Sequence, residues 1–212
     1  MEPFIRSDQF NFIKYQTQII INGHATANDL NVRRTVKDLA KEKAAGLFSD
    51  LNEEQTELIE AIHKVEDKAQ AEAYTARLYP YVIPFKSISE EGIKKLFRKV
   101  KKLRVPSIDE WDFRDISYLG WNDAGSNRKY LIIQQGDKLA GLHGTFRSIN
   151  QKGMCAICSS FQELGLFVSE TKGSGGDTFI KRGNYICTDS MICNQHLKSL
   201  DKLHDFFERL NG

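Results

Sequence analysis

Residues that break helices are scarce in the first half of this 212-residue chain. Positions 5–84 hold only two glycines, Gly23 and Gly46, and no proline before Pro80. Because glycine and proline interrupt helices, their scarcity favours a helical first half. Long apolar runs are also missing. None approaches the roughly 20 residues that a membrane-spanning helix needs, so we expect no membrane association.

Targeting signals and a large net charge are missing as well. Residues 1–4 show neither the basic start nor the apolar stretch of a secretory signal peptide. We therefore expect a soluble, cytoplasmic protein whose thiols stay reduced. The net charge is only +2, so the chain as a whole lacks the signature of a polyanion-binding protein. Its length suits one large or two small domains.

Apolar residues recur at helical spacing in four segments of the first half. These segments are residues 10–20, 30–47, 52–62 and 69–79. Asn52 and Gln55 resemble a capping box at the start of the third segment, and Gly23 with the following Ala-Thr-Ala-Asn (residues 25–28) is expected to end the first. Short connections between four helices favour an antiparallel bundle. The sequence therefore predicts an N-terminal four-helix bundle over residues 1–82.

A basic helix is predicted next, over residues 93–104, after an acidic first turn. Around its apolar stripe stand seven cationic side chains, namely Lys94, Lys95, Arg98, Lys99, Lys101, Lys102 and Arg104. Such a cluster could hold phosphates. It also suits the solvated face of a packed helix, and we favour that interpretation. The acidic residues Asp109, Glu110, Asp112 and Asp115 follow and could offset part of the charge.

Strand patterns follow at residues 116–121, 129–134 and 139–149, with a tight-turn signal at Gly136 and Asp137. We expect a small antiparallel sheet with the basic helix on one face. The glycine-rich run 173–177 lacks the ending of a phosphate-binding loop, so we expect a hairpin tip there. A last helix is predicted from an apolar stripe between Leu197 and Leu210. Phe206 lies at the edge of that stripe, where an aromatic is either half buried or a binding anchor.

The chain's four cysteines all lie near its C-terminus. Cys155 and Cys158 are two residues apart, 28 residues separate Cys158 from Cys187, and Cys193 follows soon after. Four thiolates make a closed tetrahedral zinc site. Two disulfides would need an oxidising compartment, and a redox motif would leave two of the cysteines unexplained. We predict one structural zinc ion, with His196 close by as a supporting residue or a competing ligand.

The order of elements around these cysteines indicates a particular kind of finger. A two-residue knuckle, a hairpin, and then ligands at the start of a helix are the order of a treble-clef zinc finger. We predict an α+β protein, in which a bundle over 1–82 precedes an α/β domain over 83–212. The domain carries the treble-clef-like finger in residues 153–212.

Several segments of the second half are similar to those of a known family. They are residues 97–102, 120–122, 126–130, 155–158, 181–190 and 193–194. With them the chain resembles the fusidic acid resistance proteins of the FusB/FusC type, also called elongation factor G-binding proteins, and is most like FusC. The resemblance covers the whole length of the chain. The helical half matches in size and in its apolar pattern, but it carries few specific motifs.

The resemblance implies a function that spacing alone does not indicate. Proteins of this type bind elongation factor G and promote its release from the ribosome when fusidic acid has trapped it there. The drug is neither modified nor directly bound, and the ribosome is involved only indirectly. The implied binding surface around the finger consists of Met154, Arg182, Tyr185 and Phe206. We expect a monomer with no enzymatic activity.

Two other classes of function compete with this one. A zinc-stabilised ribosome or RNA-binding protein would use the basic helix 93–104, and its binding would fall steeply with salt. An enzyme that destroys the drug is disfavoured, because no Ser/His/Asp constellation can be placed and a four-cysteine zinc has no open position.

Overall fold

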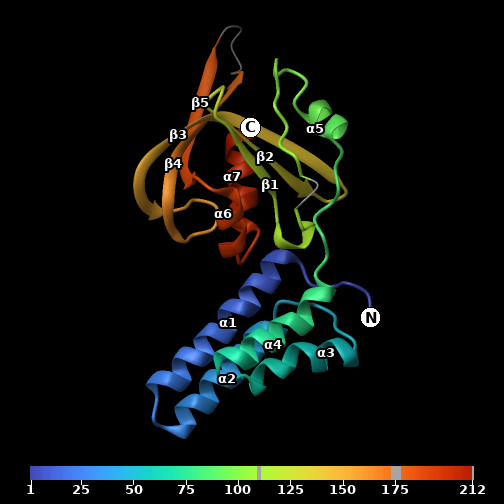
Figure 1. Cartoon of the computed structure of the whole chain (residues 1–212), viewed down its shortest axis with the longest axis vertical. Helices are drawn as coiled ribbons and strands as arrows, with labels where there is room; N and C mark the ends of the chain where they lie inside the picture. Colours follow the sequence, from blue (N-terminus) through green and yellow to red (C-terminus); the bar gives the residue numbers. More distant parts are fainter. Residues whose placement is uncertain (109–110, 173–177, 212) are drawn as a thin grey trace. The chain divides into compact units, whose positions relative to one another are not determined.

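The structure is a computed structural model that describes residues 1–108, 111–172 and 178–211. The chain divides into two compact units, Met1–Ile83 and Pro84–Gly212. The first is helical and the second is built on a sheet (Figure 1). Of the sequence-based expectations, the acidic pair Asp109 and Glu110 and the hairpin tip at 173–177 lie outside the described residues.

Four α-helices form the N-terminal unit, as predicted. They are α1 (Ser7–Thr26), α2 (Leu30–Ala45), α3 (Glu53–Glu60) and α4 (Lys68–Leu78), with 3₁₀ turns η1 (Ala61–Lys64) and η2 (Tyr79–Tyr81) after the last two. The predicted capping box is confirmed at α3. The Asn52 side chain accepts a hydrogen bond from the Gln55 backbone N–H at 2.9 Å, and the Gln55 side chain accepts one from the Asn52 N–H at 3.0 Å.

The core of this unit joins all four helices. Ile13 and Ile20 of α1 are fully buried with Ile59 and Leu78. Helix α1 continues past Gly23 and ends at Thr26, inside the segment 23–28 that was predicted to end it. A side chain at position 23 would crowd Val36 of α2, with its Cβ at 3.3 Å from a Val36 methyl group. This glycine therefore allows close helix packing.

The predicted basic helix is much shorter than expected. Helix α5 covers Glu90–Leu96, and residues 97–104 run on as turns and loop. Phe97, the residue that follows the helix, has a non-helical backbone (φ −113°, ψ 40°), and Lys102 has a left-handed backbone (φ 62°). The Phe97 ring packs edge-on against Trp121 and Tyr130, with centroids 5.9 and 5.2 Å away. Docking of this ring on the sheet offers a physical reason for the early end.

One antiparallel sheet of five strands forms the centre of the C-terminal unit (Figure 1). The strands are β1 (Leu119–Asp123), β2 (Arg128–Gln135), β3 (Lys138–Met154), β4 (Phe161–Lys172) and β5 (Phe179–Cys187). Each strand pairs with its neighbour in sequence, and a register shift lies between Ser148 and Gln151 of β3. The finger's hairpin is thus continuous with the sheet rather than appended to it.

The two faces of the sheet bury alternate residues. On β2, Tyr130 and Ile132 belong to a cluster with Ile93 and Phe97 of the α5 region. Leu131 and Ile133 belong to the opposite cluster, which includes the cysteines and the C-terminal helix. The helix predicted at the C-terminus is divided into two, α6 (Ser190–His196) and α7 (Asp201–Asn211). A short 3₁₀ turn, η3 (Phe113–Asp115), precedes β1.

Two element boundaries differ from those expected from the sequence. Leu197 and Leu200 lie in the connection between α6 and α7 instead of in one long helix, and β1 begins at Leu119 rather than at residue 116. No helix in the described ranges is both long enough and apolar enough to cross a bilayer.

Candidate metal centre and the surface around it

Three elements bring the four cysteines together. Cys155 and Cys158 lie in the turn after β3, Cys187 ends β5, and Cys193 lies in α6. The turn is folded by its own backbone. The Cys155 N–H donates to the Ser160 carbonyl at 3.1 Å, and Ser159 takes a left-handed conformation (φ 57°). At α6, the Asp189 side chain accepts hydrogen bonds from the N–H groups of Met191 and Ile192 and so caps the start of the helix.

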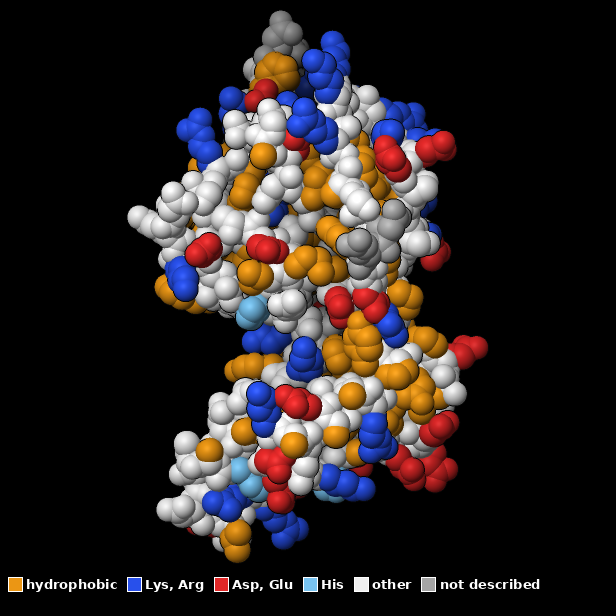
Figure 2. Space-filling model, viewed as in Figure 1, with side chains coloured by type: hydrophobic (Ala, Val, Ile, Leu, Met, Phe, Trp, Pro, Cys, Tyr) orange, Lys and Arg blue, Asp and Glu red, His pale blue; other side chains and the backbone are white. Residues whose placement is uncertain are grey.

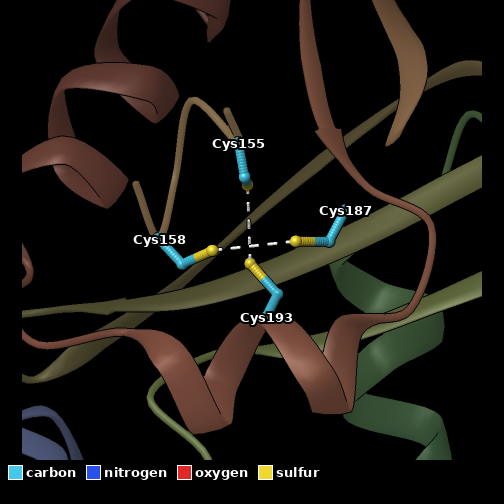
Figure 3. Close-up of side chains that lie close together, drawn as sticks. All are labelled: Cys155, Cys158, Cys187 and Cys193. Atoms are coloured by element: carbon cyan, nitrogen blue, oxygen red, sulfur yellow. Dashed lines mark hydrogen bonds between the residues drawn. The ribbon is translucent and has the colours of Figure 1, made fainter. Parts of the chain in front are cut away.

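The four sulfurs have the spacing of a tetrahedral metal site. All lie within 4.8 Å of one another, and the side chains point toward a common centre (Figure 3). The Cys155 and Cys193 sulfurs are 3.9 Å apart, and those of Cys158 and Cys187 are 3.7 Å apart. A zinc–sulfur bond of about 2.3 Å gives a tetrahedral edge of about 3.8 Å. A disulfide would need about 2.05 Å, so the donor set fits zinc.

The thiols cannot share this site as four free anions. Hydrogen bonds from the other three thiols lower the pKa of Cys155. A hydrogen bond to Cys155 is in turn the main cause that raises the pKa of Cys187 and of Cys193. Four thiolates would concentrate negative charge in a buried place, and a divalent cation that binds thiolates would compensate it.

Lys129 lies close to this cluster, and the sequence analysis did not identify it as a candidate site residue. Its side chain is fully buried, and its Nζ donates to Asn122 Oδ1 at 3.0 Å and to the Thr188 carbonyl at 2.9 Å. It also sits 4.8 Å from the centre of the Phe146 ring. Burial lowers the pKa of Lys129 to about 8, and the nearby thiolates and Asp189 oppose that shift. The alternation of β2 could have indicated it, because residue 129 is in phase with buried Leu131 and Ile133.

His196 is held beside the site by two contacts. Its Nδ1 lies 2.8 Å from the Ile192 carbonyl, and its Nε2 lies 3.2 Å from Gln162 Nε2. Among the residues that the structure describes, the potential metal-ligand atoms that cluster here are the four cysteine sulfurs alone. His196 is therefore a neighbour of the ligands.

Two of the four predicted contact residues are exposed next to the knuckle. Met154 directly precedes Cys155 and is 62% exposed, and Tyr185 on β5 is 46% exposed. The Ala156 N–H of the knuckle donates to the Tyr185 carbonyl at 2.9 Å. The backbone of Tyr185 is thus tied to the metal turn.

The other two predicted contact residues lie differently. Phe206 is only 4% exposed and packs on Phe167, with ring centroids 5.7 Å apart. The expectation of a half-buried edge residue is therefore wrong, because the sheet covers that edge of α7. Arg182 is half-buried and lies opposite Ser169 in the register of β4 and β5. The Ser169 hydroxyl donates a hydrogen bond to the Leu210 carbonyl of α7. Three positions from Tyr185, Arg182 projects from the opposite face of β5.

Phe161 is an exposed aromatic that sequence reasoning passed over. It begins β4 directly after the knuckle, pairs with Met154 across the strands and is 63% exposed. A large apolar residue just beyond a metal turn was the available signal. We call Met154, Phe161 and Tyr185 the knuckle surface.

Comparisons with known proteins agree with this architecture. Residues 4–86 match the family model described as elongation factor G-binding protein, N-terminal. Residues 93–209 match the model described as FBP C-terminal treble-clef zinc-finger. A search of curated proteins gave no significant match.

A solved structure is similar over nearly the whole chain. It is the structure of the fusidic acid resistance protein FusC, with 35% sequence identity, a TM-score of 0.86 and coverage of 97% of each chain. The treble-clef match and the clustered sulfurs together support one structural zinc ion as the cofactor. The family resemblance predicted from the sequence is confirmed, and this chain belongs to the elongation factor G-binding protein family.

Proposed function

We propose that this protein binds elongation factor G and thereby confers resistance to fusidic acid. The descriptions of the family models and the similarity to FusC support this function. The observation that carries the proposed contact is the knuckle surface. Its three large apolar side chains are exposed beside a metal turn. An exposed apolar patch on a soluble unit is a typical docking site for another protein.

The metal site makes this surface suitable for tight binding. Met154 and Phe161 face each other on paired strands, and the backbone of Tyr185 is hydrogen-bonded to the knuckle. Zinc fixes all three strand ends, so little backbone freedom is lost when a partner docks. Tyrosine and other aromatic residues are the usual energetic anchors of such contacts. We propose Tyr185 and Phe161 as anchors and Met154 as an adaptable neighbour.

Arg182 and Phe206 have supporting roles in this proposal. Phe206 holds α7 on the sheet behind the finger through Phe167, and it also lines a pocket of about 250 Å³ with Ala156 of the knuckle. Arg182 contributes positive charge on the other face of β5, where it would act on the encounter with an acidic partner more than on the bound contact.

Binding is proposed to release the factor from a ribosome stalled by the drug. The protein would act on the target and leave the drug unchanged, as a cytoplasmic monomer rather than as an enzyme. In the zinc site all four positions are filled by thiolates, so the metal has no place for water or substrate. The role proposed for zinc is therefore to stabilise the fold of the finger.

Calorimetry with purified elongation factor G, without ribosomes, tests the contact. Tyr185→Ala and Phe161→Ala should each weaken binding by about 2 kcal/mol, or roughly 30-fold in Kd, because each removes a proposed anchor. Phe179→Ala is the matched control, since Phe179 is 57% exposed at the far end of β5. It should leave Kd unchanged.

Zinc content and circular dichroism show whether each variant keeps its fold. If both knuckle variants are folded and bind as tightly as the original protein, the knuckle surface is not the contact. If the original protein does not bind elongation factor G at all, the proposed function itself is wrong.

A further inference from the structure

The end of α5 and the loop after it concentrate positive charge on the surface of the C-terminal unit. All seven lysine and arginine side chains between positions 94 and 104 are exposed. Figure 2 shows Lys and Arg side chains gathered over the end of the C-terminal unit where this loop runs. We call residues 94–104 the basic segment.

Among the described residues, most of these cationic side chains form no ion pair. Lys94 pairs with Glu90 at 2.6 Å, and Arg104 lies near Asp123, whose pKa its charge helps to lower. The remaining five have no carboxylate within 4.0 Å in the part of the chain that the structure describes; they are Lys95, Arg98, Lys99, Lys101 and Lys102. Like charges held this closely repel one another, and a polyanion would relieve that repulsion.

The backbone of the basic segment is fixed at both ends. Phe97 is buried in the ring cluster on the sheet, and Gly141 beneath it leaves room for that ring, because a Cβ there would lie 2.8 Å from it. At the other end, the Trp121 indole N–H donates to the Arg104 carbonyl at 3.0 Å. Since the loop is already ordered, binding costs less conformational entropy.

A groove runs along one side of the segment. Lys95, Arg98 and Lys99 line a cavity of about 380 Å³, whose other walls are β3, β4 and the end of α7. Glu170 lines the same groove, and its carboxylate is paired with Lys181 at 3.4 Å. Lysine and arginine side chains are common donors to phosphate oxygens.

From these observations we propose that the basic segment binds the phosphate backbone of RNA. An acidic protein is the other possible polyanion, but protein contacts draw most of their energy from exposed apolar anchors. The segment offers none, since Phe97 is buried and Leu96, Val100 and Leu103 are partly buried against the sheet. Phosphate binding needs only cations. The segment meets β3 near Gly141, whereas the knuckle surface lies at the other end of that strand.

The test measures binding of the zinc-loaded full chain to an unstructured RNA of about 20 nucleotides, which exceeds common single-strand site sizes. Kd should rise steeply between about 50 and 200 mM salt. In the triple variant Lys95→Gln, Arg98→Gln and Lys99→Gln, Kd at low salt should rise at least about tenfold. The salt slope should fall by about 2, at about 0.7 for each lost contact.

A second triple variant, Arg34→Gln, Lys43→Gln and Lys68→Gln, is the matched control. It removes the same charge from exposed positions on α2 and α4 and should bind RNA as the original protein does. The basic-segment variant should also keep its zinc and its affinity for elongation factor G, which separates this proposal from the proposed function.

Three results would overturn the proposal. In the first, the original protein does not bind RNA at low salt. In the second, both triple variants lose affinity equally, which would indicate general charge attraction. In the third, a polyglutamate peptide of equal charge binds as tightly as the RNA, which would point to an acidic protein partner.

Discussion

At the scale of single residues, Lys129 has a role that its surroundings define closely. A zinc ion with four thiolates carries a net charge of about −2, and this buried ammonium lies close by. It also satisfies Asn122 Oδ1 and the Thr188 carbonyl, next in sequence to the ligand Cys187. Lys129 thus offsets negative charge at the metal site and also holds the backbone beside the ligand Cys187 in place.

Replacing this lysine should therefore weaken the metal site. Lys129→Met keeps the aliphatic bulk but removes the donor to Asn122 Oδ1 and leaves the metal charge uncompensated, while the Thr188 carbonyl keeps its hydrogen bond from the Asn122 amide at 2.9 Å. We expect zinc affinity to fall about tenfold, as for other supporting contacts around metals. The unfolding free energy should fall by about 3 kcal/mol. Chelator competition measures the first effect and thermal unfolding the second.

The exposed Lys138 provides the control for this change. Lys138→Met should alter neither zinc affinity nor melting temperature. Equal behaviour of the two variants would mean that the charge of Lys129 does not support the site.

Residue-scale prediction from sequence succeeded where spacing carried the information. Two residues between Cys155 and Cys158 are enough to indicate a shared ion. The sequence-based prediction failed for the exposure of Phe206, because its burial depends on Phe167, which is far away in sequence. Helical phase places a side chain around its own axis, but it does not say which neighbouring element covers that side.

At the scale of elements, the end of α5 shows the same limit. Apolar residues continue at helical spacing to Leu103, yet the helix ends at Leu96. The decisive contacts are those of Phe97 with the rings on β1 and β2. The four N-terminal helices were predictable, because local caps such as Asn52 agree there with the apolar pattern.

Truncating the ring that anchors α5 should destabilise the C-terminal unit. Phe97→Ala should cost about 3–5 kcal/mol, because it opens a cavity beside Trp121 and Tyr130. Both tryptophans of the chain, Trp111 and Trp121, lie in this unit. Urea unfolding followed by tryptophan fluorescence therefore reports on the C-terminal unit alone.

Val100→Ala is the comparison, since Val100 is only partly buried in the same cluster. Its unfolding free energy should fall by less than half as much. A Phe97→Ala protein with an unchanged urea midpoint would contradict the anchoring role.

At the scale of the whole molecule, each unit has a core of its own. The N-terminal cluster contains residues from 1–83 only, and the two C-terminal clusters contain residues from 84–212 only. A unit with its own buried core can fold alone in principle. The sequence indicated this division through the change from helical to strand patterns around Pro80 and Pro84. It did not indicate that the finger's hairpin and the small sheet are one continuous structure.

Separating the units should therefore separate their properties. Residues 84–212 should fold with one zinc ion and bind elongation factor G with nearly the affinity of the full chain, because they carry the whole knuckle surface. Residues 1–83 should be helical and should not bind. Calorimetry and circular dichroism on both fragments check this, and binding by the helical fragment alone would reverse the assignment.

The order of strands in the sheet has a consequence for synthesis of the chain. Each strand pairs with the one made just before it, so hairpins can form one after another as the polypeptide leaves the ribosome. The zinc site cannot be completed in the same stepwise way. Cys155 and Cys158 are made first and form an open half-site until Cys187 and Cys193 have followed. The metal can therefore close the finger only after β4, β5 and the start of α6 have been made.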